Sequence, residues 1–290
     1  MSVQISMQAP ASPVGRVNVP AERLKRLLLW LTGASSAIVF IEPSPYEVVS
    51  LLTLVVFVIG GLSLSSTLLP LGLLLLLLNF GYSISASAVI NEQGVLTWIL
   101  TSWYLALTAV FFAAMLGADT KARLDALTRG CIIAAMIGSI FAIVGYFRLF
   151  PGANDLLLLY DRARGTFKDP NVLGAFLVFP TLLALQRVLT GNLKQAAGGA
   201  VLTGLFVAAI LLSFSRGAWG QVVLASGIVL VLTFMTSRSP SVRLRLVLLT
   251  VAGVAVMTLF VVSLLSIDRV AELFKERAQF EQSYDVGEQG

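Results

Sequence analysis

The sequence predicts an all-α polytopic membrane protein with about nine transmembrane helices. Only 12% of its 290 residues are charged, which is about half the share in a soluble domain, and 57% are hydrophobic. Folded in water, such a chain would expose far more contiguous apolar surface than soluble proteins tolerate. Its charged residues are also spaced widely enough to leave uncharged runs of membrane-crossing length. A water-soluble globular protein is therefore excluded.

The spans follow from the uncharged gaps, because a charge in the centre of a bilayer is costly. The long gap between Glu47 and Glu92 holds two spans, with a break expected around residues 60–66. The gap between Arg26 and Glu42 is the shortest, and a re-entrant or tilted segment is the alternative there. Six further gaps hold one span each: 92–119, 129–148, 169–187, 194–216, 216–238 and 245–268, with charged residues as their bounds. The expected organisation is an N-terminal segment 1–26, a transmembrane domain 27–267 and a further segment 268–290.

The distribution of charge between the spans predicts the orientation. With the N-terminus cytoplasmic, most Lys and Arg residues lie on the inner side, and Glu22, Asp119 and Asp125 are the only acidic residues there. The same count of charged residues indicates that the short uncharged run between Arg26 and Glu42 crosses the membrane. Without that crossing, the basic residues up to Arg26 would lie on the outer side. Residue 290 is then expected on the outer side.

The composition excludes several kinds of chemistry. The single cysteine, Cys131, excludes a disulfide framework and a cysteine-ligated zinc site. The chain contains no histidine, so no imidazole can serve as a general base or metal ligand. Phosphate-binding loops, dinucleotide fingerprints and nucleophile elbows are also missing from the sequence. We therefore expect no metal, no cofactor and no nucleic-acid partner.

Basic residues on the outer side depart from the positive-inside rule, which the inner loops obey. They are Arg162, Arg164 and Lys168 before the sixth span, Arg216 between the seventh and eighth, Arg269, Lys275 and Arg277 after the ninth, and Arg148. Positive charge kept on the disfavoured side indicates a bound anion. Interfacial anchoring by snorkelling side chains is the alternative, above all for Arg148, Arg269 and Lys275. An amphipathic helix expected over residues 267–280 places Arg277 where it can reach back to the membrane.

Helix direction gives a second argument for an anion site. The sixth span is expected to begin at Asp169, Pro170 and Asn171, with Asp169 as the N-cap, and the eighth just after Ser215 and Arg216. Both would present N-terminal N–H groups on the outer side, where a phosphate or pyrophosphate can bind. Plain helix capping is the alternative for the residues at 169–171. Residues 154–161 are expected to form a short amphipathic or interfacial segment, and a loop helix lying on lipid is the favoured alternative.

Three motifs together resemble the bacterial O-antigen ligase and polymerase superfamily. They are RGTFKDPNVLGAFLVFP at residues 164–180, SFSRGAWG at 213–220 and ERAQFEQSYDVGEQG at 276–290. The resemblance covers residues 130–290 by motif and the earlier spans by hydropathy. It implies a C-type glycosyltransferase fold in the bacterial inner membrane, with the N-terminus cytoplasmic, residue 290 periplasmic and residues 268–290 as the start of an incomplete periplasmic domain.

The resemblance also implies the chemistry. Such a protein moves a glycan from undecaprenyl pyrophosphate to an acceptor hydroxyl, on the lipid A core or on a growing glycan, without metal or nucleotide. Arg216 matches the family's arginine, whereas the family's catalytic histidine falls beyond residue 290, so we expect a truncated chain that does not transfer glycan alone. The expected substrate-binding residues are Arg162, Arg164, Lys168, Asn171, Arg216 and Arg277, with the catalytic residues unknown.

Two other classes of function remain open. A transporter or flippase for lipid-linked glycan would also use many spans and outer basic residues, although such carriers commonly keep charges within their spans. A catalytically silent membrane fragment is the other alternative, because the chain has no histidine. Ligase and polymerase are not separable from these residues. In every case membrane lipid surrounds the chain.

Overall fold

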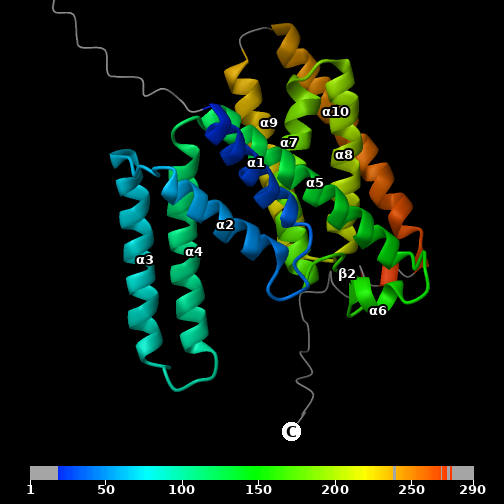
Figure 1. Cartoon of the computed structure of the whole chain (residues 1–290). Helices are drawn as coiled ribbons and strands as arrows, with labels where there is room; N and C mark the ends of the chain where they lie inside the picture. The colour runs from blue at the N-terminus through cyan, green and yellow to red at the C-terminus, as the bar shows by residue number, and fades with distance from the viewer. Residues whose placement is uncertain (1–18, 238–239, 269, 273–274, 276–290) are drawn as a thin grey trace, which may run out of the picture. The chain divides into compact units, whose positions relative to one another are not determined.

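The computed structural model describes residues 19–237, 240–268, 270–272 and 275 (Figure 1). Its elements, in chain order, are α1 (Val19–Ser35), α2 (Pro45–Ile59), the 3-10 helix η1 (Ser66–Leu68), α3 (Leu69–Ser87), α4 (Val95–Leu116), α5 (Thr120–Tyr146), α6 (Ala153–Leu157), β1 (Leu158–Leu159), β2 (Arg162–Ala163), α7 (Pro170–Thr190), α8 (Leu193–Leu212), α9 (Arg216–Thr236) and α10 (Pro240–Leu265). Apart from one short hairpin, the described secondary structure is helical, as the sequence predicts.

Seven helices of the described chain are long and apolar enough to cross a membrane. They are η1 continued by α3, then α4, α5, α7, α8, α9 and α10, and they correspond to the third to ninth expected spans. The prediction of a polytopic helical membrane protein is confirmed to this extent. The expected break around residues 60–66 is also confirmed, because α2 ends at Ile59 and η1 begins at Ser66.

The first two expected spans differ from the sequence prediction. Helix α1 has 17 residues and starts at Val19, well before Arg26, so the gap between Arg26 and Glu42 does not mark its bounds. Helix α2 has 15 residues. At 1.5 Å per residue, both are shorter than the roughly 30 Å of hydrocarbon that a perpendicular helix crosses. The count of nine crossings stays a prediction.

The chain divides into two compact units, of which unit 1 comprises the described residues of 1–31 and residues 50–127. Within it, α3 and α4 form an antiparallel pair (Figure 1). Polar side chains join these two apolar helices: Ser102 Oγ donates to Asn79 Oδ1 at 2.7 Å, and Trp103 Nε1 donates to Ser83 Oγ at 3.2 Å. Such hydrogen bonds hold helices together in lipid, where the hydrophobic effect between them is absent.

A buried ion pair ties α1 to the start of α5 within unit 1. Arg123 Nε and Nη2 donate to the two carboxylate oxygens of Glu22 at 2.8 and 2.7 Å, and Arg123 Nη1 donates to the carbonyl of Met115 at 2.6 Å. The guanidinium carbon also lies 5.2 Å from the ring centroid of Phe57, a cation–π contact. The hydrogen bond from Arg123 lowers the pKa of the Glu22 carboxyl below its ordinary value.

Unit 2 comprises residues 32–49 and the described residues from 128 onward. Its core contains Leu173 and Leu177 of α7 and Phe206 and Ile210 of α8, all fully buried. Helices α7 and α8 approach closely at Gly199, where a Cβ atom would lie 2.7 Å from the carbonyl oxygen of Ala184. The segment that carries the expected anion site belongs to this unit.

Candidate anion site at the starts of α7 and α9

The loop between α5 and α7 folds back as a small hairpin. Strands β1 and β2 pair in antiparallel register, and Tyr160 and Asp161 between them both have positive φ, 51° and 56°. Two such residues form the type I′ turn that suits a two-residue hairpin. Of the short helix expected over residues 154–161, only the first part is helical: α6 covers Ala153–Leu157, with Ala153 and Leu157 buried and Leu156 exposed, and the rest belongs to the hairpin.

Arg162 is the buried centre of the site. Its exposed fraction is 7%, its Nε donates to the carbonyl of Ser213 at 2.9 Å, and its Nη2 donates to Oδ1 of Asn171 at 2.7 Å. One guanidinium thus joins the hairpin to the first turn of α7 and to the C-cap of α8. Because both acceptors are neutral oxygens, these two bonds hold the side chain without cancelling its charge.

Both predicted helix starts are confirmed. Asp169 caps α7 by accepting from the Asn171 N–H at 2.6 Å, and α7 begins at Pro170. Ser215 caps α9 by accepting from the Ala218 N–H at 3.4 Å, and α9 begins at Arg216. Serine and aspartate are preferred caps because their oxygens satisfy N–H groups that have no partner within the helix.

The first turns of α7 and α9 pack directly against each other at Gly174. A Cβ atom there would lie 2.8 Å from the Ala218 side chain, 3.0 Å from Ser213 Oγ and 3.1 Å from the Ser215 side chain. Only glycine allows this approach without a shift of the neighbours. Two helix N-termini, each with a positive dipole end, therefore lie side by side.

The remaining predicted site residues take different places. Arg216 is exposed on the first turn of α9, next to the paired helix ends. Lys168 is exposed and forms an ion pair with Glu42. Arg164 turns back to α6, where its Nη2 donates to the carbonyl of Leu156 at 3.1 Å. Arg277 lies outside the described residues. The structure thus joins Arg162 to Asn171 close to the start of α9, which carries Arg216. It directs the Arg164 guanidinium towards α6.

The connection between α1 and α2 contributes to the site, which the sequence did not predict. The Val39 N–H donates to the carbonyl of Thr166 at 3.0 Å, and Glu42 of the same connection pairs with Lys168. These contacts join residues more than a hundred positions apart, and no local pattern signals them. The charge distribution did assign Glu42 and Lys168 to the same side of the membrane.

The site can bind an anion but offers little as a base. Asp169 is engaged as the cap of α7, and Asp161 lies 3.9 Å from the guanidinium of Arg148. In the described part of the chain, no three His, Cys, Asp or Glu side chains gather in a metal-binding arrangement. The chemistry available here is charge stabilisation by N–H groups and guanidinium groups.

No family model, no curated protein and no solved structure matches this chain. The resemblance to the O-antigen ligase and polymerase superfamily therefore stays a prediction that depends on the three motifs.

Proposed function

We propose that the chain is an O-antigen ligase-like glycosyltransferase component of the bacterial inner membrane. In this proposal it binds an undecaprenyl-pyrophosphate-linked glycan at the periplasmic face and presents it to an acceptor hydroxyl on the lipid A core or on a growing glycan. The observation that carries the proposal is the direct packing of the capped starts of α7 and α9 at Gly174, with Arg216 exposed beside them.

The arrangement suits a pyrophosphate because several of its features favour negative charge at one place. The two helix starts present positive dipole ends. Arg216 adds a planar guanidinium that can bind two phosphate oxygens at once. Arg162, held beneath by Asn171 and the Ser213 carbonyl, adds a second positive charge. Together these groups would stabilise the charge that develops on a departing pyrophosphate.

The proposal assigns the donor's pyrophosphate to these residues and does not assign the base. Deprotonating a sugar hydroxyl near neutral pH requires a base whose pKa lies near the working pH. The chain has no histidine, and Asp169 is already engaged as a helix cap. Binding of the donor by this chain therefore does not require that the chain also transfers the glycan.

The contacts within each unit support the predicted sidedness. In unit 1, Glu22 contacts Arg123 and Lys25 contacts the carbonyl of Gly60, and the charge distribution assigns all four residues to the inner side. In unit 2, the α1–α2 connection contacts the loop that carries Lys168, and both were assigned to the outer side.

The proposal is tested by measuring donor binding and glycan transfer separately. The protein is reconstituted in liposomes with an undecaprenyl-pyrophosphate-linked glycan and a lipid A core acceptor. Arg216→Ala should weaken donor binding by about tenfold or more, because a hydrogen bond to a charged group contributes about 1.5–3 kcal/mol. Arg216→Lys keeps the positive charge but cannot bind two phosphate oxygens in the bidentate geometry of a guanidinium. Its donor affinity should lie between those of the unchanged protein and Arg216→Ala.

Arg148→Ala is the matched control, since Arg148 is an exposed arginine paired with Asp161 on the same predicted side. Its donor affinity should stay near that of the unchanged protein. Unchanged donor binding in Arg216→Ala would overturn the proposed site. Movement of the lipid-linked donor across the liposome membrane, with no transfer product, would favour the flippase alternative instead.

A further inference from the structure

A second feature of unit 2 is a groove lined by α5, α7, α8 and the turn that joins α7 to α8. This open groove has a volume of about 740 Å³, which is within the range of roughly 300–1,000 Å³ found for small-molecule sites. The lining residues are Met136, Arg187, Thr190, Gly191, Gln195, Gly198, Gly199, Val201 and Leu202. None of them belongs to the anion site at the starts of α7 and α9.

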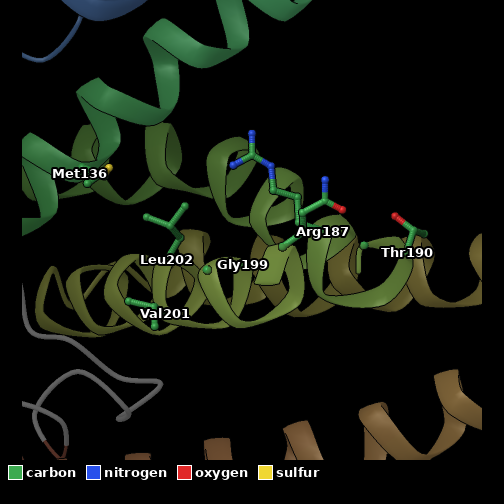
Figure 2. A pocket seen from close by; sticks show the side chains of 9 residues that line it. Met136, Arg187, Thr190, Gly199, Val201 and Leu202 are labelled. Carbon is green, nitrogen blue, oxygen red and sulfur yellow. The ribbon is translucent and has the colours of Figure 1, made fainter. Parts of the chain in front are cut away.

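The groove changes in polarity along its length. Figure 2 shows Arg187 and Thr190 towards one end and Met136, Leu202 and Val201 towards the other. The polar end lies at the turn where α7 ends and α8 begins. Because both helices are apolar and long enough to cross a membrane, the membrane interface is expected at this turn. The apolar end lies about two turns deeper along α8, roughly 10 Å at 1.5 Å per residue. A molecule with a polar head and an aliphatic chain matches this gradient.

Of the helices that line the groove, α7 and α8 carry no acidic residue, and α5 carries only Asp125, 11 residues before Met136. From residue 170 to 267 the sequence contains no Asp or Glu, while its basic residues are Arg187, Lys194, Arg216, Arg238, Arg243 and Arg245. Helices α7 to α9, and α10 to its end at Leu265, therefore provide no carboxylate for Arg187. The Arg187 side chain is exposed, so an anion from outside the protein can reach it.

The glycines of α8 make room for an aliphatic chain. Gly199 packs against α7, and its missing side chain lets the two helices approach. Gly198 lies beside it, lines the groove and has open space around the position of a Cβ atom. The open position leaves the groove free at this point, and a side chain added there would extend into it.

We propose that this groove binds one anionic phospholipid, with its phosphate at Arg187 and the start of an acyl chain along Gly198 and Leu202. Basic pockets between transmembrane helices on the cytoplasmic side bind anionic lipid headgroups, and the predicted orientation places this turn on that side. Gln195 adds an amide: its Oε1 accepts from the Asn192 N–H at 3.0 Å, which leaves its N–H groups to donate to the headgroup, whereas the Thr190 hydroxyl donates to the Gln186 carbonyl at 2.9 Å. The proposal is independent of the proposed function, since it concerns other residues and the opposite predicted side.

The test is a titration of the full chain, purified in detergent, with fluorescent phosphatidylglycerol and, separately, with fluorescent phosphatidylcholine. The unchanged protein should bind phosphatidylglycerol more tightly. Arg187→Gln should lower that affinity by about fivefold, the effect of about 1 kcal/mol per basic residue near a lipid surface, and leave phosphatidylcholine binding unchanged. Arg187→Lys should keep the preference for the anionic lipid.

Two matched controls separate the groove from general effects. Lys194→Gln removes a charge from the same turn region but outside the lining, and it should leave the preference intact. Gly198→Leu should weaken binding of both lipids by filling the groove, whereas Gly204→Leu, also in open space on α8 but outside the lining, should not. Equal binding of the two lipids, an equal loss with Lys194→Gln, or unchanged binding with Gly198→Leu would each overturn the proposal.

Discussion

Removing one partner of the Glu22–Arg123 ion pair should destabilise unit 1 more than removing both. The Arg123 and Glu22 side chains are only 7% and 12% exposed, and two short hydrogen bonds join them. Breaking a buried pair by removing one partner costs about 3–5 kcal/mol, because the other charge stays buried and uncompensated. We expect Glu22→Gln to cost about 3 kcal/mol, the lower end of that range, since an amide oxygen can still accept one hydrogen bond from Arg123.

The double variant Glu22→Gln, Arg123→Met carries no buried charge at this position. Its loss of unfolding free energy should therefore fall short of the sum of the two single losses by about 2 kcal/mol or more, which measures the coupling between the partners. Arg123→Met also removes the donor to the Met115 carbonyl, so the double variant should remain less stable than the unchanged protein.

The same pair predicts a dependence of stability on pH. Arg123 holds the pKa of Glu22 below its ordinary value of 4.5, so the carboxylate contributes stability above that pH. The contribution is lost as the pH falls through the lowered pKa, where the folded protein also takes up the proton. The unfolding free energy of the unchanged protein should therefore fall in acid more steeply than that of Glu22→Gln.

The measurement is reversible unfolding in mixed micelles, followed by helicity, for the unchanged protein, the two single variants and the double variant. Lys121→Gln, an exposed position on the same end of α5, serves as the control and should change stability by less than about 0.5 kcal/mol. Additive losses in the double variant, or a cost below about 1 kcal/mol for Glu22→Gln, would show that the pair does not stabilise the unit in this way.

Three further predictions concern the anion site and the topology. Arg162→Lys keeps the charge but cannot bond Asn171 and the Ser213 carbonyl together, so donor affinity should fall by about tenfold in the liposome binding assay. Gly174→Val should separate the starts of α7 and α9 and lower thermal stability by an amount corresponding to about 2 kcal/mol or more. In a Cys131→Ala background, Tyr160→Cys, which is exposed, should react with an impermeant maleimide from the periplasmic side.

Each of these predictions has an outcome that contradicts it. Donor affinity unchanged by Arg162→Lys would mean that the buried guanidinium does not position the site. A Gly174→Val protein as stable as the original would mean that the two helix ends are not in contact. Labelling of position 160 only after the membrane is permeabilised would reverse the predicted orientation.

The features that the sequence predicted correctly depend on neighbours along the chain. Asp169 and Pro170 mark a helix start because capping and the fixed φ of proline act within one turn. Ser215 does the same for α9, and the break after Ile59 falls within the predicted stretch that begins at Gly60. The apolar runs between charged residues identified seven of the helices, since each run by itself is long enough to cross a bilayer.

The features that the sequence missed depend on contacts between distant segments. The sequence placed Arg162 in an outer loop as an expected substrate-binding residue, and it did not predict that Arg162 is buried and bonded to Asn171 and to the Ser213 carbonyl. Those bonds form only after α7, α8 and the hairpin have packed. The Tyr160–Asp161 turn was missed because neither residue is the glycine or asparagine that usually signals a type I′ hairpin there.

The two short helices, α1 and α2, leave the predicted side of every later helix unchanged only if both of them cross the membrane or neither does. If both cross the membrane, α3 begins on the side of the N-terminus, and the same holds if neither crosses. Their contacts favour two crossings. Glu22 near the start of α1 bonds to Arg123, which is assigned inside, while Glu42 in the connection to α2 pairs with Lys168, which is assigned outside. If the two predicted sides hold, the chain crosses the membrane between Glu22 and Glu42, and short helices can cross where the bilayer thins locally or where adjoining non-helical backbone is buried in protein.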